Sequence, residues 1–193
     1  MGGCALHRET SGVYAFFDTR FFGPTAIAAF PLPAMLTFKL IILLLAANGA
    51  PIMARKVLGS RYAWPLDGGV RLKDGRPLLG PSKTWRGLIA ALLFSGLMAV
   101  LLGLPLWLGI RFGGGAMLGD MFSSFLKRRL GVPSSGMALG LDQVPEALFP
   151  LLAVRADLGL GTSYILWLVL GFLILELILS RILFALHIRE QPH

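Results

Sequence analysis

The sequence predicts an all-α integral membrane protein: a bundle of about five transmembrane helices joined by two cytoplasmic loops. Hydrophobic residues make up 55% of the 193 residues and charged residues only 15%, whereas soluble domains carry about 25% charged residues. The mean hydropathy is +0.73. The basic residues gather between apolar segments, which is typical of loops that flank a bilayer. The length favours a single domain.

Residues 1–34 differ from the rest of the chain. They mix polar, aromatic, Gly and Pro residues without a sustained period, and they lack the basic-then-apolar order of a signal peptide. An orderly apolar pattern begins at Met35. We therefore expect residues 1–34 to be an N-terminal extension outside the fold, with Met35 as the natural start. Residues 35–193 would form the membrane domain.

Five apolar segments approach the roughly 20 residues that a helix needs to cross a bilayer. The second stops at Gly103 and Pro105, and the third ends at the basic triplet 127–129. The fourth is short and contains Pro150, whereas the fifth is long and rich in Leu and Ile. The five segments are 35–54, 87–104, 106–126, 144–156 and 162–186.

The first segment contains Asn48 and Pro51, and we expect the helix to be broken or unwound there. Unwound backbone at membrane depth is tolerated where it is buried in protein or lines a cavity. Asn48 is therefore a candidate site residue. A helix kink in which the side chain of Asn48 is hydrogen-bonded within the protein explains the pattern equally well.

The positions of Lys and Arg predict the orientation in the bilayer. Loop 55–86 carries eight basic residues against two Asp, and loop 127–143 is also basic, whereas the opposite side has Arg111 and Arg155. A multi-pass protein of the cell inner (cytoplasmic) membrane, with both loops in the cytoplasm, satisfies this distribution. Nucleic acid is not expected as a partner, because the basic residues lie between apolar spans. The single Cys4 excludes an intramolecular disulfide framework and a zinc site built from cysteines.

A polar face interrupts the end of the third span. In a helix, Asp120, Ser123, Ser124 and Lys127 fall at i, i+3, i+4 and i+7, which is one face. Mg²⁺ prefers oxygen ligands, usually one or two carboxylates with substrate phosphates, and Asp142 from the next loop could complete such a set. The alternative is that Asp120 only pairs with Lys127 or another base.

Two further segments, the basic triplet 127–129 and the Gly-rich loop 55–86, could each bind phosphate or have only a structural role. Lys127, Arg128 and Arg129 suit a phosphate, but a basic triplet at a helix end is often only a topology anchor. In loop 55–86, Gly-rich turns with Lys83 and Arg86 suit phosphate oxygens. The same loop could be a turn-rich connector with Trp85 as an interfacial anchor.

These motifs together resemble the CDP-archaeol synthase family, which is related to the CDP-diacylglycerol synthases. The resemblance covers about Met35 to the C-terminus. The matching motifs are Asn48 with Pro51, Pro65-Leu66-Asp67-Gly68-Gly69, Asp74-Gly75, Leu79-Gly80, Lys83-Thr84-Trp85-Arg86-Gly87, Gly119-Asp120, Ser124-Phe125-Leu126-Lys127-Arg128-Arg129-Leu130-Gly131 and Asp142-Gln143. The His-Gly-Gly-x-x-Asp-Arg-x-Asp signature of the diacylglycerol enzymes is absent, and Asp142-Gln143 stands in its place, as in the archaeal-lipid branch.

The resemblance implies a membrane cytidylyltransferase that transfers CMP from CTP to a lipid phosphate in the bilayer, with Mg²⁺ as cofactor. It implies catalytic roles for Asp120, Lys127 and Asp142, with Asp120 and Asp142 as metal ligands. The substrate-binding residues that it implies are Asn48, Asp67, Lys83, Thr84, Arg86, Ser124, Arg128 and Gln143.

Two other functions remain open at this point. One is an inactive lipid- or nucleotide-binding membrane protein on the same scaffold. The other is a small transporter in which Asp120 and Glu176 relay ions, although the polar residues crowd the cytoplasmic end instead of crossing the bundle. The residues indicate no particular oligomeric state.

Overall fold

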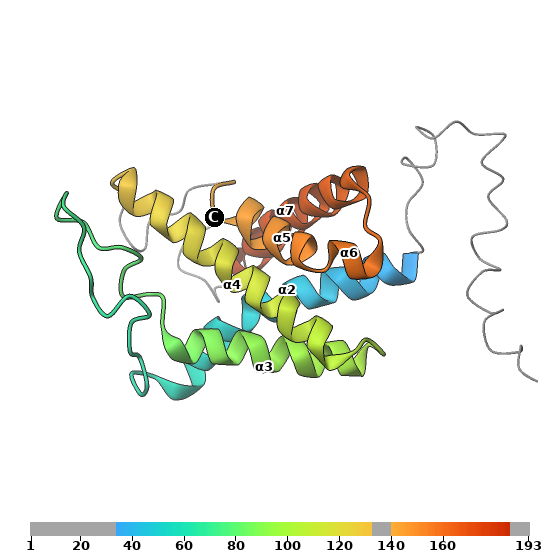
Figure 1. Ribbon diagram of the computed structural model, residues 1–193, viewed down its shortest axis with the longest axis horizontal. Helices are drawn as coiled ribbons and strands as arrows, with labels where there is room; N and C mark the ends of the chain where they lie inside the picture. Colours follow the sequence, from blue (N-terminus) through green and yellow to red (C-terminus); the bar gives the residue numbers. More distant parts are fainter. Residues whose placement is uncertain (1–33, 133–139, 186–193) are drawn as a thin grey trace, which may run out of the picture. The chain divides into compact units, whose positions relative to one another are not determined.

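The computed structural model describes residues 34–132 and 140–185, and the regular secondary structure in these ranges consists of helices (Figure 1). The helices are α2 (Ala34–Leu58), α3 (Trp85–Leu101), α4 (Leu106–Arg129), α5 (Gln143–Ala153), α6 (Arg155–Leu158) and α7 (Thr162–Ala185). The described part has no strand beyond two isolated β-bridges. The predicted N-terminal extension lies outside the described residues except for Ala34, and it stays a prediction.

A helix occupies each of the five predicted apolar segments. In the described part, α2 and the Thr162–Leu179 stretch of α7 are long and apolar enough to cross a membrane, and α3 is apolar but shorter. α4 has 24 residues but includes charged side chains, and α5 has only 11 residues. That all five cross the bilayer therefore stays a prediction.

The break expected near Asn48 and Pro51 is wrong, because α2 continues through Pro51. A proline removes one N–H donor from a helix, and in a bundle the neighbouring segments compensate for that loss. Pro51 lies beside the first turn of α3, where Gly87 leaves room: a Cβ atom added to Gly87 would lie 3.4 Å from Cβ of Pro51.

Glycines bring α4 into backbone contact with both of its neighbours, α3 and α5. A Cβ atom added to Gly109 would lie 2.4 Å from the carbonyl oxygen of Ser95 on α3. A Cβ atom added to Gly119 would lie 2.1 Å from the carbonyl oxygen of Pro145 on α5. Small residues allow such close approach between helices in membranes. Gly113 and Gly115 make the same kind of approach, to α3 and α5 respectively.

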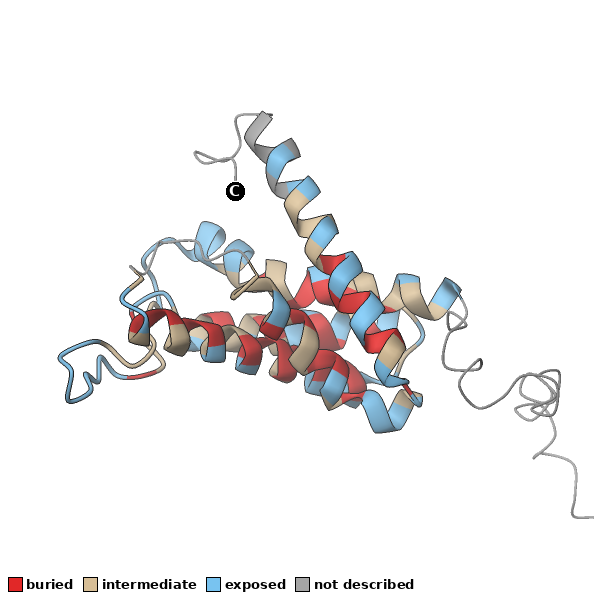
Figure 2. Cartoon of the chain, turned by 90° about the horizontal axis from the view of Figure 1, so that it is seen from above, coloured by how far each residue is buried: buried red, intermediate tan, exposed pale blue. Residues whose placement is uncertain are grey.

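The hydrophobic core lies between α2, α4, α5 and α7. Its fully buried side chains include Leu43, Phe112, Leu151 and Phe172. Beyond Phe172, α7 is half-buried or exposed as far as Leu179 (Figure 2).

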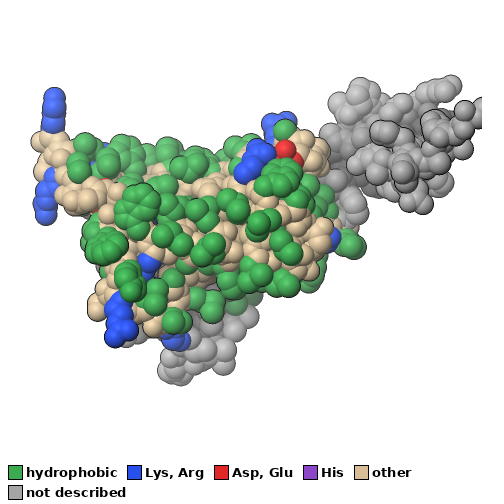
Figure 3. Space-filling view, turned by 60° about the horizontal axis from the view of Figure 1, so that its bottom comes forward, with side chains coloured by type: hydrophobic (Ala, Val, Ile, Leu, Met, Phe, Trp, Pro, Cys, Tyr) green, Lys and Arg blue, Asp and Glu red, His purple; other side chains and the backbone are tan. Residues whose placement is uncertain are grey.

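The outer surface carries many large apolar side chains. Trp167 is 72% exposed and Leu93 is 69% exposed. In Figure 3, hydrophobic side chains cover much of the visible face and several Lys and Arg side chains lie near its edges. Soluble monomers rarely expose such extended apolar surfaces, so the surface agrees with a bilayer environment.

Candidate active site

A cavity of about 250 Å³ lies where α2, α4, α5 and the start of α3 meet. Three cations and two carboxylates line it, which gives the lining a formal charge of +1. Such a lining suits an anionic ligand. The charged residues of the lining are Arg55, Lys83, Arg86, Asp120 and Glu146.

An ion pair crosses this cavity from the start of α3 to α4. The Nζ atom of Lys83 donates to Oδ1 of Asp120 at 2.5 Å. Lys83 directly precedes Thr84, the N-cap of α3, whose hydroxyl oxygen accepts a hydrogen bond from the amide of Gly87 at 3.4 Å. The carbonyl of Lys83 accepts from the amide of Leu66 at 2.8 Å. The backbone that follows Lys83 is therefore held in place.

A second carboxyl group, that of Glu146 on α5, lines the same cavity as Asp120. The contact of Gly119 with Pro145 brings the two helices together at this point. Sequence reasoning missed Glu146, although a carboxylate inside an apolar segment is a signal of a functional residue.

A second ion pair lies further along α4. The Nζ atom of Lys127 donates to Oδ2 of Asp142 at 3.0 Å, and Asp142 does not line the cavity. Seven residues of helix, from Asp120 to Lys127, correspond to about 10 Å. Asp120 therefore pairs with Lys83, which is the other base that the alternative interpretation allowed, and Lys127 pairs with Asp142.

A metal ligand set of Asp120 with Asp142 stays a prediction. Among the described residues, no group of three or more His, Cys, Asp or Glu side chains could hold a metal ion. A bound metal would therefore need oxygen atoms from its substrates.

Asn48 faces the same cavity from α2. Its side-chain nitrogen Nδ2 is buried and has no hydrogen-bond partner in the described part of the chain. Buried donors are normally satisfied, so this amide is available to an acceptor atom of a ligand. The alternative was a kinked helix in which the side chain of Asn48 is hydrogen-bonded within the protein. It does not agree with the unpaired Nδ2 atom.

Arg86 also lines the cavity, but its guanidinium group is partly engaged elsewhere. Its NH1 atom donates to the carbonyl oxygens of Gly59 at 2.6 Å and Arg61 at 2.7 Å. Arg86 therefore ties the end of α2 to the start of α3 and contributes positive charge to the cavity.

Asp67 organises the loop that connects α2 to α3. Its carboxylate accepts hydrogen bonds from the backbone amides of Gly69, Leu79 and Gly80 at 2.9–3.0 Å. Burial alone would raise the pKa of Asp67, but these amide hydrogen bonds outweigh it and hold the pKa below the ordinary value. Asp67 does not line the cavity, so its visible role is to shape the loop.

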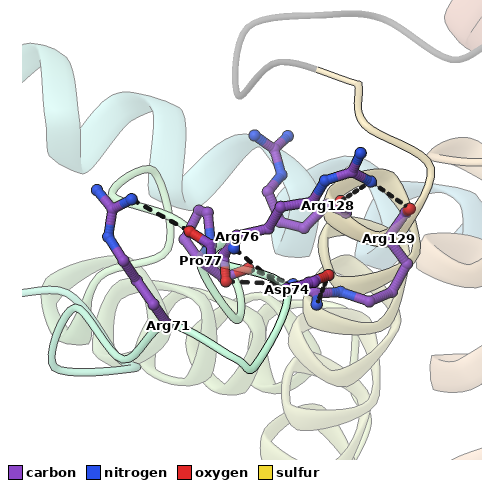
Figure 4. A network of polar contacts seen from close by, with 7 residues as sticks. Arg71, Asp74, Arg76, Pro77, Arg128 and Arg129 are labelled. Carbon is purple, nitrogen blue, oxygen red and sulfur yellow. Dashed lines mark hydrogen bonds and ion pairs between the residues drawn. The ribbon is translucent and has the colours of Figure 1, made fainter.

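The tip of the same loop is fastened to the C-terminal end of α4 by what we call the clasp, formed by Asp74, Arg76, Pro77 and Arg129 (Figure 4). Arg129 donates to Oδ2 of Asp74 at 2.5 Å and to the carbonyl oxygen of Pro77 at 2.7 Å. Arg76 donates in return to the carbonyl oxygen of Arg129 at 2.6 Å. The clasp satisfies carbonyl oxygens that a helix end leaves without partners.

Three other predicted residues lie outside the cavity lining. Ser124 and Arg128 are buried in α4. Gln143, at the start of α5, accepts a hydrogen bond at Oε1 from the amide of Gly140 at 2.8 Å. The structure thus gathers Asn48, Lys83, Thr84, Arg86 and Asp120 at the cavity, and it leaves Asp67, Ser124, Lys127, Arg128, Asp142 and Gln143 outside the lining.

Comparison with known proteins gives consistent matches. A family model described as CarS-like, CDP-archaeol synthase, matches residues 33–193. A CDP-archaeol synthase of Hyperthermus butylicus is 42% identical over 122 residues, which are 60% of this chain and 70% of that protein. One of Thermococcus onnurineus is 38% identical over 109 residues, 51% of this chain and 61% of that protein.

A solved structure, described as an intramembrane enzyme for archaeal membrane lipids biosynthesis, has the same fold. It superposes with a TM-score of 0.63 at 34% sequence identity, and the match covers 74% of this chain and 90% of that one.

Proposed function

The chain belongs to the CDP-archaeol synthase family, and from this premise we propose that it is an intramembrane cytidylyltransferase that makes a CDP-activated lipid from CTP. An oxygen of a lipid phosphate attacks the α-phosphorus of CTP. The bond from that phosphorus to the bridging oxygen of the β-phosphate breaks, and pyrophosphate leaves with the electron pair. Given the names of the relatives, the acceptor is an archaeal lipid phosphate whose product corresponds to CDP-archaeol.

The observation that carries this proposal is the positively charged cavity crossed by the Lys83–Asp120 ion pair. The nucleophile is already ionised, so the site needs to position two anions and neutralise them rather than remove a proton. Lys83 and Arg55 supply positive charge to the triphosphate, and the buried amide of Asn48 donates to one of its oxygens.

The residues of the cavity fit Mg²⁺ as cofactor. The carboxylate of Asp120 offers the oxygen ligands that this hard cation prefers, and substrate phosphates usually complete its coordination. When bound, Mg²⁺ would neutralise phosphate oxygens and polarise the phosphoryl group. Asp142 serves through its ion pair with Lys127, which holds the basic end of α4 near the start of α5.

We place the cavity at the cytoplasmic face of the membrane, since the basic loops 55–86 and 127–143 flank it in sequence and the positive side usually faces the cytoplasm. CTP then enters from the cytosol while the lipid tails stay in hydrocarbon. No observation favours the inactive binding protein, and the family match supports an enzyme rather than a transporter.

The test is direct. The full chain, purified in detergent, is incubated with Mg²⁺, CTP labelled at the α-phosphate and a panel of lipid phosphates. We expect label in a lipid product and one pyrophosphate released per product. If no lipid phosphate is labelled while the protein still shows a cooperative thermal transition, the proposal fails.

A further inference from the structure

We propose that a cluster of aromatic and basic side chains beside the start of α3 inserts into the headgroup region of the adjacent membrane leaflet and binds anionic lipid there. We call this cluster the surface anchor, and its residues are Lys56, Arg61, Tyr62, Trp64 and Trp85. None of these residues lines the cavity. The inference therefore goes beyond the proposed function and does not depend on it.

An apolar ridge on α3 ends at Trp85 and marks the depth of the membrane surface. Exposed apolar side chains follow one another at four-residue spacing, at Trp85, Ile89 and Leu93, and positions with this spacing form one ridge of a helix surface. The ridge is suited to contact with lipid tails. Trp is enriched where a spanning helix enters the headgroup region, so Trp85 indicates where that region lies.

Trp64 is tied to Trp85 through the backbone, although the two residues lie on different segments. The amide of Trp85 donates to the carbonyl oxygen of Trp64 at 3.1 Å. Next to this contact, Pro65 and Thr84 form an antiparallel β-bridge. Trp64 is 67% exposed and Trp85 is 49% exposed. The two indole groups therefore extend the apolar surface of α3 into the connecting loop.

Tyr62 is held in a strained conformation beside Trp64. Its φ of 56° lies in the left-handed region, which residues other than glycine rarely adopt. Its ring packs edge-to-face against Trp64 with the centroids 6.1 Å apart, yet Tyr62 stays 61% exposed. Such strain persists where the surroundings impose it, and it often marks a segment that binds a ligand. Here Arg86 holds the turn through the carbonyl oxygens of Gly59 and Arg61.

The charge of the surface anchor identifies anionic lipid as its partner. Lys56 and Arg61 are exposed, and residues 52–66 contain no acidic side chain. Basic side chains beside a bilayer attract anionic headgroups, and Tyr and Trp place their rings among headgroups while their polar edges stay wet. A membrane surface is favoured over a protein partner, because the aromatic side chains continue the apolar ridge of α3.

The experiment measures the depth of Trp64 by fluorescence. In the full chain Trp85, Trp107 and Trp167 are replaced by Phe, and the protein is placed in nanodiscs of phosphatidylcholine, alone or mixed with phosphatidylglycerol. We expect lipid brominated in the upper part of its acyl chains to quench Trp64. Aqueous iodide should quench Trp64 about threefold less than an indole in water.

The matched control is Val70→Trp in a chain whose four native Trp residues are replaced by Phe. Val70 lies on the same connecting loop, outside the surface anchor, and is 52% exposed. Iodide should quench this indole strongly, and brominated lipid should not. Strong iodide quenching of Trp64 without quenching by brominated lipid would refute the surface anchor and leave the aromatic side chains as a contact for a protein.

A second comparison tests the anionic lipid. Brominated lipid should quench Trp64 more strongly in nanodiscs that contain phosphatidylglycerol, and Arg61→Gln should remove about half of this difference or more. Lys73→Gln removes the same charge at the exposed loop tip and should leave the difference unchanged. Equal quenching of Trp64 in the two lipid mixtures would overturn the binding of anionic lipid.

A further variant covers the case in which the chain with Trp64 alone does not fold. The wild type and Trp64→Phe are then compared in the same nanodiscs. Loss of a lipid-quenched component in Trp64→Phe would support the surface anchor, and equal quenching of the two proteins would refute it. None of these measurements uses CTP, so their failure leaves the proposed function standing, and a failed assay for CDP-lipid leaves the surface anchor standing.

Discussion

The Nζ atom of Lys83 lies 2.5 Å from Oδ1 of Asp120, although the two residues are 37 positions apart in the chain. Their side chains are 16% and 20% exposed, so water screens the pair only in part. This contact ties the segment before α3 to α4.

Replacement of Asp120 by Asn should abolish most of the turnover. The amide loses the negative charge that faces Lys83 and cannot ligate Mg²⁺ as a carboxylate does. Loss of one directly acting polar group in an active site typically costs about 100-fold to 1,000-fold in kcat. CDP-lipid formation by the purified variant checks this, with membrane insertion verified by fractionation. Turnover within threefold of the wild type would remove Asp120 from its assigned role.

Replacement of Gly119 by Ala should destabilise the protein. The added Cβ atom would meet the carbonyl oxygen of Pro145 at 2.1 Å, and backbone cannot move aside as a flexible side chain can. Overpacking of this kind costs about 1–3 kcal/mol, occasionally more. The free energy of unfolding in mixed detergent and denaturant measures the effect.

Gly114 on the same helix is the control for Gly119. The nearest atom to its added Cβ is Cδ2 of Leu92 at 3.6 Å, an ordinary contact. Because Ala favours a helix over Gly by about 1 kcal/mol, Gly114→Ala should leave stability unchanged or raise it. Equal destabilisation by the two substitutions would contradict the close contact between α4 and α5.

The contribution of Asp67 to stability should depend on pH. Its pKa is lower in the folded protein than in the unfolded chain, because backbone amides of Gly69, Leu79 and Gly80 stabilise the carboxylate. The folded state therefore gains stability from the ionised form above the unfolded pKa of about 3.9. This gain is lost as the pH falls through the lowered pKa.

The measurement compares the thermal midpoints of the wild type and Asp67→Asn. We expect the wild type to be more stable by a constant margin from pH 7 down to about pH 5. Below about pH 4 the margin should shrink as the carboxylate becomes protonated. A margin that stays the same down to pH 2 would exclude the ionised carboxylate as its source.

Replacement of Arg129 by Ala should release the loop tip from α4. The variant loses hydrogen bonds to Asp74 and to the carbonyl oxygen of Pro77. The groups are largely at the surface, where single ion pairs contribute little to global stability. We therefore expect faster cleavage by a protease within residues 71–77 with little change in the thermal midpoint.

The control for this experiment is Arg111→Ala, which breaks the ion pair with Asp157 and leaves the clasp intact. It should not change the rate of cleavage in the loop. If Arg129→Ala and the wild type are cleaved at the same rate, the side chain of Arg129 does not hold the loop, and the hydrogen bonds from Arg76 to the carbonyl oxygens of residues 128 and 129 suffice.

Hydrophobic patterning predicted the positions of the helices well, because most of the apolar segments are long and are bounded by Gly, Pro or basic residues. It failed at Pro51, where the helix continues, since local propensity carries no information about the packing of α2 against α3. Helical periodicity singled out Asp120, and this residue lines the cavity. It could not identify Lys83 as its partner, because that contact depends on how a 26-residue connection between Leu58 and Trp85 folds back.

The same limit explains why sequence reasoning missed Glu146. Asp142 is the N-cap of α5 and Glu146 lies in its first turn, and the sequence alone does not say which residue faces α4 at the level of Asp120. The contact between Gly119 and Pro145 determines which residue of α5 faces α4 there. It depends on the backbone of Pro145 and on the absence of a side chain at Gly119. Such a contact leaves no charge or hydrophobicity signal that a periodicity argument could use.

The pairing of Lys83 with Asp120 also has a consequence for biogenesis. The chain is synthesised from its N-terminus, so Lys83 emerges from the ribosome before Asp120 does. A bare carboxylate on an inserting helix is costly in hydrocarbon, and α4 carries Asp120 into contact with a lysine that α3 has already delivered. The counter-ion is thus synthesised before the acidic residue with which it pairs.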